Sequence, residues 1–191
     1  LIGQNFEPWA STILKMTKSK TSIYYVTEKL PLLSAGSGKD PHIWQSPEIM
    51  ILAIENLSNF FQLKFPQEKN EISKKTKAYL SRLKQFQNKM KSNFKTLPSG
   101  NKKMVVAHNS FQYFSQEFDI EVYSPLEVSQ EGETSVQKFS KLIKLIRQNK
   151  ISSLFFENST SEGLMKSISQ ETGFPIKGTL YSDSLSADNI A

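Results

Sequence analysis

Residues 66–97 place the strongest constraint on the fold, because they carry one apolar stripe with the spacing of an α-helix. Apolar side chains recur at intervals of three, four or seven residues: Ile72, Tyr79, Leu83, Phe86, Met90, Phe94 and Leu97. Pro66 suits the first turn of a helix, and Pro98 ends the pattern. Such a helix is roughly 45 Å long, at about 1.5 Å per residue. The pattern therefore predicts a single rigid helix that joins two lobes.

The positive charge of the chain is concentrated in the same stretch. The 191 residues have a formal net charge of +6, and residues 66–97 hold eight Lys and one Arg against two Glu. This stretch therefore carries +7, and the rest of the chain is close to −1. A basic stretch is compatible with nucleic-acid binding. We nevertheless expect these lysines to form the solvated outer face of the helix.

Strand and helix patterns alternate on both sides of the long helix. Upstream, they predict a helix at 8–18, a strand at 22–27 and a helix at 47–61. Downstream, they predict strands near 103–107, 120–123, 151–156 and 175–181. Helices are predicted from Ser110, at 135–148 and after Ser159, where the last one ends at Gly173. The pairs Thr134 with Gln137 and Ser159 with Glu162 are predicted to cap the last two helices.

This alternation predicts an α/β fold class: two lobes with parallel β-sheets flanked by helices, joined by one long rigid helix. The expected domains are a partial N-terminal α/β lobe at 1–65, the connecting helix at 66–98 and a C-terminal α/β lobe at 99–191. No stretch approaches the ~20 consecutive apolar residues that a transmembrane helix needs. The sequence contains no cysteine, which excludes thiolate metal sites and Cys nucleophiles.

Polar side chains with metal-binding chemistry follow three of the predicted strands. His108 follows the strand at 103–107, Glu157 follows that at 151–156, and Asp183 follows that at 175–181. Ligands bind outside the carboxyl ends of strands in parallel α/β sheets. The other histidine, His42, lies in a turn stiffened by Pro41. Imidazoles with a carboxylate suit a divalent transition metal such as zinc, manganese or iron.

Simpler roles remain open for each of these residues. Asp183 fits an Asx turn, Glu157 fits the acidic first turn of a helix, and His42 fits a polar loop. The sequence has no Walker loop, no G-x-G-x-x-G, no G-x-S-x-G and no H-E-x-x-H motif. It also shows no nucleophile beside a base, so we expect no enzyme activity.

Five segments resemble one family of proteins. D-P-H-I-W-Q-S-P at 40–47 resembles the D-P-H-x-W-x-x-P signature of the metal-binding solute receptors of ABC importers, the cluster A-I zinc- and manganese-uptake lipoproteins. V-V-A-H-N-S-F-Q-Y-F at 105–114, S-L-F-F-E-N-S at 153–159 and L-Y-S-D-S-L-S at 180–186 are similar to three further segments of that family. N-F-E-P-W at 5–9 is similar to the opening of its N-lobe helix.

The resemblance implies a metal site with His42, His108 and Asp183 as ligands, and with Glu157 beside the site, orienting a ligand imidazole. It implies a fourth ligand, a histidine upstream of Leu1. The chain then looks truncated at both ends, without signal peptide, lipid-bearing cysteine or last C-terminal helix. The transported ligand is expected to be Zn²⁺ or Mn²⁺, with Fe²⁺ third.

The function that the resemblance implies is an extracytoplasmic receptor that captures a divalent metal between two lobes and delivers it to an ABC transporter permease. We expect a monomer at the periplasmic or cell-surface side, lipid-anchored in the full-length protein, with no nucleic acid as partner. The first alternative is a zinc-dependent hydrolase with Glu157 as general base. The second is a basic nucleic-acid-binding module that uses residues 66–97.

Overall fold

The computed structural model describes residues 7–18, 23–36, 38–125 and 135–185. The chain divides into two compact units, Leu1–Ser92 (unit 1) and Asn93–Ala191 (unit 2). Among the described residues, no helix combines the length and the apolar character that crossing a membrane requires.

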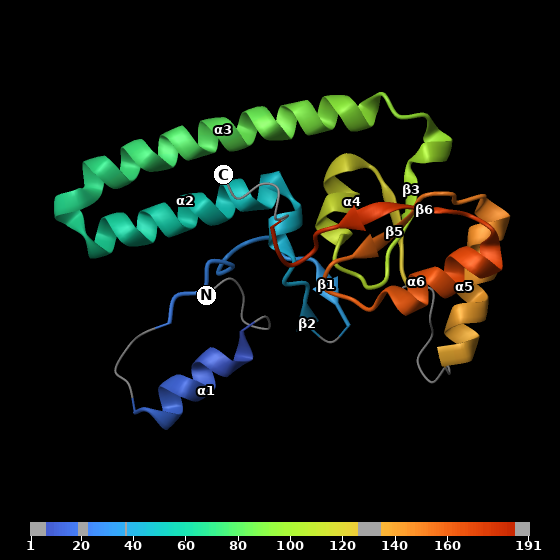
Figure 1. The fold of residues 1–191 in the computed structure, drawn as a ribbon. Helices are drawn as coiled ribbons and strands as arrows, with labels where there is room; N and C mark the ends of the chain where they lie inside the picture. Colours follow the sequence, from blue (N-terminus) through green and yellow to red (C-terminus); the bar gives the residue numbers. More distant parts are fainter. Residues whose placement is uncertain (1–6, 19–22, 37, 126–134, 186–191) are drawn as a thin grey trace. The chain divides into compact units, whose positions relative to one another are not determined.

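Unit 1 is mainly helical in its described part (Figure 1). Its elements, in chain order, are α1 (Pro8–Met16), β1 (Ser34–Ala35), β2 (Gly38–Lys39), η1 (Ile43–Gln45), α2 (Pro47–Lys64), η2 (Pro66–Glu68) and α3 (Lys69–Lys95), whose last turn belongs to unit 2. The predicted helices at 8–18, 47–61 and 66–97 are thus confirmed. α2 begins at Pro47 because Ser46 caps it, its hydroxyl accepting a hydrogen bond from the Ile49 N–H at 3.2 Å.

The strand predicted at 22–27 is wrong for the residues that the structure describes there. Residues 23–25 have no regular structure and residues 26–29 form a turn, while residue 22 lies outside the described part. The only sheet described in unit 1 is the antiparallel pair β1–β2, in which Ser34 faces Lys39. A β-rich sequence forms a strand only beside a partner, and the described residues of unit 1 offer none to this segment.

α3 runs beside α2, as Figure 1 shows. The hydroxyls of Thr76 and Ser58 hydrogen bond at 2.8 Å, and Lys91 forms an ion pair with Glu48 at 3.2 Å. None of the residues of α3 is buried. The predicted stripe is therefore only partly covered, and two of its three aromatic members, Tyr79 and Phe86, are exposed.

Unit 2 contains a four-stranded parallel sheet in the order β4-β3-β5-β6. Its elements are η3 (Ser99–Asn101), β3 (Lys103–Val105), α4 (Gln112–Phe118), β4 (Glu121–Tyr123), α5 (Ser135–Asn149), β5 (Leu154–Glu157), α6 (Glu162–Thr172) and β6 (Ile176–Leu180). The α/β class with a parallel sheet, flanking helices and one long helix is thus confirmed.

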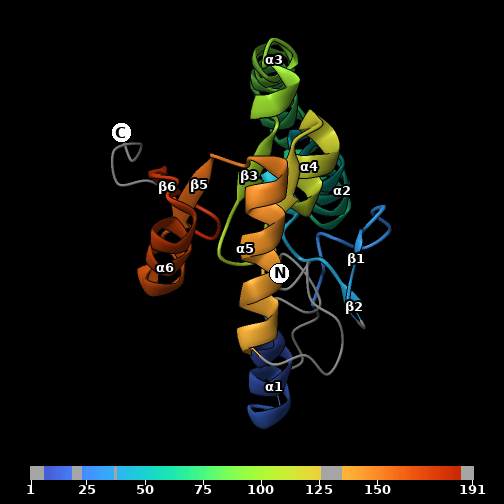
Figure 2. The same cartoon turned by 90° about the vertical axis from the view of Figure 1, so that its right-hand side faces the viewer.

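The core of unit 2 lies between the sheet and two helices. Leu142 and Ile146 of α5 and Ile168 of α6 are fully buried and pack with Val105 and Leu154 of the sheet. Figure 2 shows α6 beside β5 and β6. This packing fixes the carboxyl ends of β3, β5 and β6 relative to one another.

The ends of α6 show how local residues set the helix. Its N-cap is Ser161, whose hydroxyl accepts from the Gly163 N–H, so the predicted capping by Ser159 is wrong. Ser159 instead pairs with the Ser182 hydroxyl at 2.8 Å. The helix ends at Gly173, as predicted, with a left-handed φ of 74°. The capping box predicted at Thr134 lies outside the described residues.

Candidate metal centre

His42 of unit 1 is held by a carboxylate two residues before it. Asp40 is 1% exposed, and its Oδ1 accepts the His42 backbone N–H at 2.9 Å. The same oxygen lies 2.6 Å from Nδ1 of the His42 ring. One carboxylate oxygen therefore fixes both the backbone and the ring of this histidine. In the neutral ring, this contact places the proton on Nδ1 and leaves the lone pair on Nε2.

The surrounding sequence makes this turn stiff. Pro41 fixes its own backbone angle, and the next residue after His42, Ile43, is 1% exposed. Trp44 lies edge-on to the imidazole, with ring centroids 5.3 Å apart. The His42 ring is thus fixed by an anchored backbone, a hydrogen-bonding carboxylate and an aromatic neighbour.

His108 of unit 2 is held in a comparable way by Glu157. Nδ1 of His108 lies 2.7 Å from Oε2 of Glu157, and the Ser110 hydroxyl donates to the same oxygen at 3.0 Å. The other oxygen, Oε1, accepts the backbone N–H groups of Ala107 at 2.7 Å and of His108 at 2.9 Å. Glu157 ends β5 and His108 follows β3, so two adjacent strands bring the pair together.

Glu157 is only 2% exposed, yet its surroundings keep it ionised. Burial raises the pKa of this carboxyl, but the side-chain and backbone hydrogen bonds from His108, the charge of His108 and the hydrogen bond from Ser110 lower it by more. The net pKa lies below the ordinary value of 4.5. A buried carboxylate with several donors is therefore the group that faces Nδ1 of His108.

Asp183 lies in the loop after β6, which is tied to the loop after β5. The Asn158 side chain accepts the Ser182 N–H at 3.1 Å and donates to the Ser184 hydroxyl at 2.6 Å. The Asn158 N–H bonds the Leu180 carbonyl at 3.1 Å. These bonds fix the Ser182 backbone before Asp183 and the Ser184 side chain after it.

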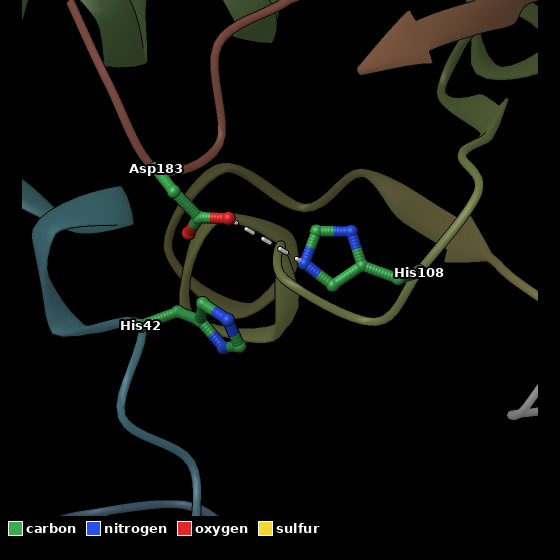
Figure 3. A group of neighbouring side chains, drawn as sticks. All are labelled: His42, His108 and Asp183. Carbon is green, nitrogen blue, oxygen red and sulfur yellow. Dashed lines mark ion pairs between the residues drawn. The ribbon is translucent and has the colours of Figure 1, made fainter. Parts of the chain in front are cut away.

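His108 and Asp183 face each other in unit 2 (Figure 3). Nε2 of His108 lies 4.0 Å from Oδ2 of Asp183, which is too long for a direct hydrogen bond. An imidazole nitrogen and a carboxylate oxygen at this separation can both bind one cation, because the distance from a zinc ion to each such ligand atom is about 2.1 Å. The structure thus brings His108, Glu157 and Asp183 together, while His42 belongs to unit 1 and has its own carboxylate, Asp40.

Three residues of this arrangement received no role from the sequence: Asp40, Ser110 and Asn158. Asp40 had a detectable signal, because an Asp often hydrogen bonds the backbone two residues on. Ser110 and Asn158 act through residues far along the chain, Glu157 and Ser182. Only the packing of neighbouring strands shows those contacts.

Comparison with known proteins gives a consistent set of similarities. A family model described as ZnuA, zinc-uptake complex component A, periplasmic, matches residues 1–190. The metal ABC transporter substrate-binding lipoprotein FimA of Streptococcus parasanguinis is 30% identical over 150 residues, covering 78% of this chain and 48% of the relative. The manganese ABC transporter substrate-binding lipoprotein PsaA of Streptococcus mitis is 30% identical over 147 residues, covering 77% of this chain and 48% of the relative.

Solved structures show the same fold. The periplasmic zinc-binding protein TroA from Treponema pallidum superposes with a TM-score of 0.84 at 20% identity, covering 98% of this chain and 71% of that protein. The chain spans about half the length of the two curated relatives it matches above.

Proposed function

Because the chain belongs to the ZnuA family of periplasmic zinc-uptake components, we propose that the protein is a metal receptor. It captures a divalent transition metal and delivers it to the membrane permease of an ABC importer. The observation that carries this proposal is the carboxylate contact that each of the two histidines makes through its ring. Each has its Nδ1 against a buried carboxylate, Asp40 or Glu157, so each presents Nε2 as a metal-binding atom.

The proposed ligands are His42, His108 and Asp183. Two neutral imidazoles and one carboxylate form a donor set that zinc and manganese both accept. Asp183 is the anionic ligand, since its Oδ2 faces His108 Nε2 across 4.0 Å. Glu157 stays outside the ligand set, because its two oxygens are already occupied by four donor groups of residues 107–110.

Zinc and manganese are the two candidate metals. PsaA is named a manganese protein, and TroA is named a zinc protein. Imidazole-rich sites bind Zn²⁺ more tightly than Mn²⁺ by the Irving–Williams order. We therefore propose that the protein binds zinc more tightly than manganese in vitro. Which metal it transports then depends on which of the two is available to the cell. Fe²⁺ is the third candidate.

The relatives are named substrate-binding lipoproteins of ABC transporters. We extend this role to the present protein: it works outside the cytoplasm, anchored by a lipid, as a monomer that meets its permease when loaded. The hydrolase alternative has no counterpart among these relatives. Nor does the site provide the general base it requires, since Glu157 is occupied by hydrogen bonds.

Calorimetric titration of the metal-stripped protein with Zn²⁺ and then Mn²⁺ tests the proposal. We expect one-to-one binding that His42→Ala, His108→Ala and Asp183→Asn each weaken by at least roughly tenfold, since each removes a ligand. Asp119→Asn is the matched control, because Asp119 is an exposed carboxylate of the same unit that pairs with Lys102. It should leave metal affinity unchanged. Binding that survives all three ligand substitutions would refute the site.

A further inference from the structure

The solvent-facing side of α3 carries basic and aromatic residues in alternation. Lys75, Tyr79, Arg82, Phe86 and Lys89 follow one another at spacings of four, three, four and three, which aligns them along one side of a helix. All five are exposed, Tyr79 to 48% and Phe86 to 51%. We call these five residues the basic–aromatic row. The spacing of these residues is visible in the sequence, and the structure adds that both rings are exposed.

The row is separate from the side of α3 that packs in unit 1. Thr76 hydrogen bonds Ser58 of α2, and the half-buried residues Leu80 and Leu83 lie nearer that contact around the helix. Two rings that are about half exposed on one side of the helix leave apolar area in water that a partner can cover. The row therefore has the character of a contact surface that α2 does not occupy.

The charge on α3 is almost entirely positive. α3 holds eight Lys and Arg82 against a single acidic residue, Glu71. Glu71 pairs only with Lys75, at 3.6 Å and with both side chains largely exposed. Over the length of the row, about 21 Å at 1.5 Å per residue, no other acidic side chain lies on α3. The surface complementary to this row is anionic.

We propose that the basic–aromatic row docks unit 1 onto the surface of an anionic lipid bilayer. A straight helix meets a plane along its whole length, so all five side chains can reach the headgroups together. Tyr and Phe rings then lie at the interface, and the long Lys and Arg side chains extend to the phosphates. Single-stranded nucleic acid is instead held in basic grooves with stacking platforms, and this row lies on a convex helix surface. The proposal goes beyond metal capture and involves none of the proposed ligands.

The expected strength follows from the three cations of the row. Each Lys or Arg near an anionic bilayer increases binding about fivefold, so three together give on the order of a hundredfold. The attraction is screened within roughly 8 Å at physiological ionic strength. Binding should therefore weaken as salt is raised, while the contribution of the two rings persists.

Vesicle flotation with the full chain, free of metal, tests the proposal. The probes are vesicles of phosphatidylcholine alone and of phosphatidylcholine with phosphatidylglycerol in roughly a three-to-one ratio. We expect the protein to float only with the anionic vesicles. The row variant Lys75→Gln, Arg82→Gln, Lys89→Gln should bind roughly a hundredfold less. The ring variant Tyr79→Ser, Phe86→Ser, which keeps every charge, should bind roughly tenfold less.

The matched control removes the same charge from another side of the same helix. Lys74, Lys77 and Lys84 are exposed and lie outside the row. Their triple change to Gln should leave most of the binding in place. Metal titration of every variant separates the two proposals, because loss of vesicle binding with full metal affinity concerns the row alone.

Three results would overturn the proposal. One is equal flotation with neutral and anionic vesicles, or none with either. Another is equal weakening in the row variant and the control variant, which would mean that only total charge matters. The third comes from a competition experiment on protein bound to anionic vesicles. If single-stranded RNA releases the protein at a lower concentration than added competitor vesicles do, the row binds nucleic acid instead.

Discussion

Replacing Glu157 by Gln is the most informative single change in unit 2. Gln keeps the size of the side chain but replaces one carboxylate oxygen by an amide NH₂. The remaining oxygen is expected to face the fixed backbone N–H groups of Ala107 and His108. The NH₂ then faces the Ser110 hydroxyl, which can turn to accept, and Nδ1 of His108, which accepts only without its proton. The proton of the ring moves to Nε2.

The size of the effect follows from these contacts. A hydrogen bond to a charged group contributes roughly 1.5–3 kcal/mol and a neutral one about 1 kcal/mol. The bonds with the two backbone N–H groups and with Ser110 change from charged to neutral, which should lower the free energy of unfolding by about 3 kcal/mol. A proton on Nε2 also blocks the proposed ligand atom of His108, so metal affinity should fall roughly 10- to 100-fold.

Nitrogen NMR of the metal-free protein reads this change directly. The sequence contains two histidines, so the spectrum contains His42 as an internal reference whose own carboxylate is untouched. We expect His108 to carry its proton on Nδ1 in the native protein and on Nε2 in Glu157→Gln, while His42 is unchanged. Glu162→Gln, an exposed carboxylate on α6, is the control. An unchanged His108 tautomer together with unchanged metal affinity would refute the role given to Glu157.

Three further outcomes can be measured by denaturant unfolding. The pKa of Glu157 is lowered in the folded protein, so the unfolded chain binds more protons than the folded one as pH falls through 4.5. The native protein should therefore be more stable than Glu157→Gln above that pH, and this difference in unfolding free energy should shrink below it. Leu154→Ala, at a fully buried core position, should cost about 3 kcal/mol, while Val136→Ala, 77% exposed, should cost nothing measurable; equal effects would contradict the packing. Gly173→Ala should cost roughly 1–2 kcal/mol because its φ of 74° is left-handed, whereas Gly163→Ala inside α6 should stabilise by up to about 1 kcal/mol, and the reverse order would be inconsistent with the helix end described.

The sequence predicts best where periodicity and end signals agree. α2 and α3 have clear apolar spacing and proline boundaries, and both helices form where predicted. The strand at 22–27 fails because β-propensity describes a side-chain preference, while a strand also needs a neighbour. Ser159 fails as a cap because its hydroxyl meets Ser182, a partner that becomes adjacent only through the β5–β6 pairing.

The candidate site divides in the same way. The position of His108 and Glu157 at strand ends is readable from the pattern, because parallel strands end at one edge of a sheet. The four donors around Glu157 are not readable, because each depends on the exact register of β3 against β5. The exposure of Tyr79 and Phe86 was also hidden, since an apolar stripe does not tell how much of it a partner covers.

α3 has no buried side chain, and this affects how easily its backbone hydrogen bonds break. Hydrogen bonds of a helix that little tertiary packing protects break by local fraying and partial melting, at a free energy well below that of global unfolding. The amides of β5 sit instead against the buried core of unit 2 and open only when that unit unfolds. In hydrogen–deuterium exchange, amides in the middle of α3 should therefore be labelled long before those of Leu154 and Phe155. A helix that spans from one unit into the next should therefore lose its protection before the core of unit 2 does.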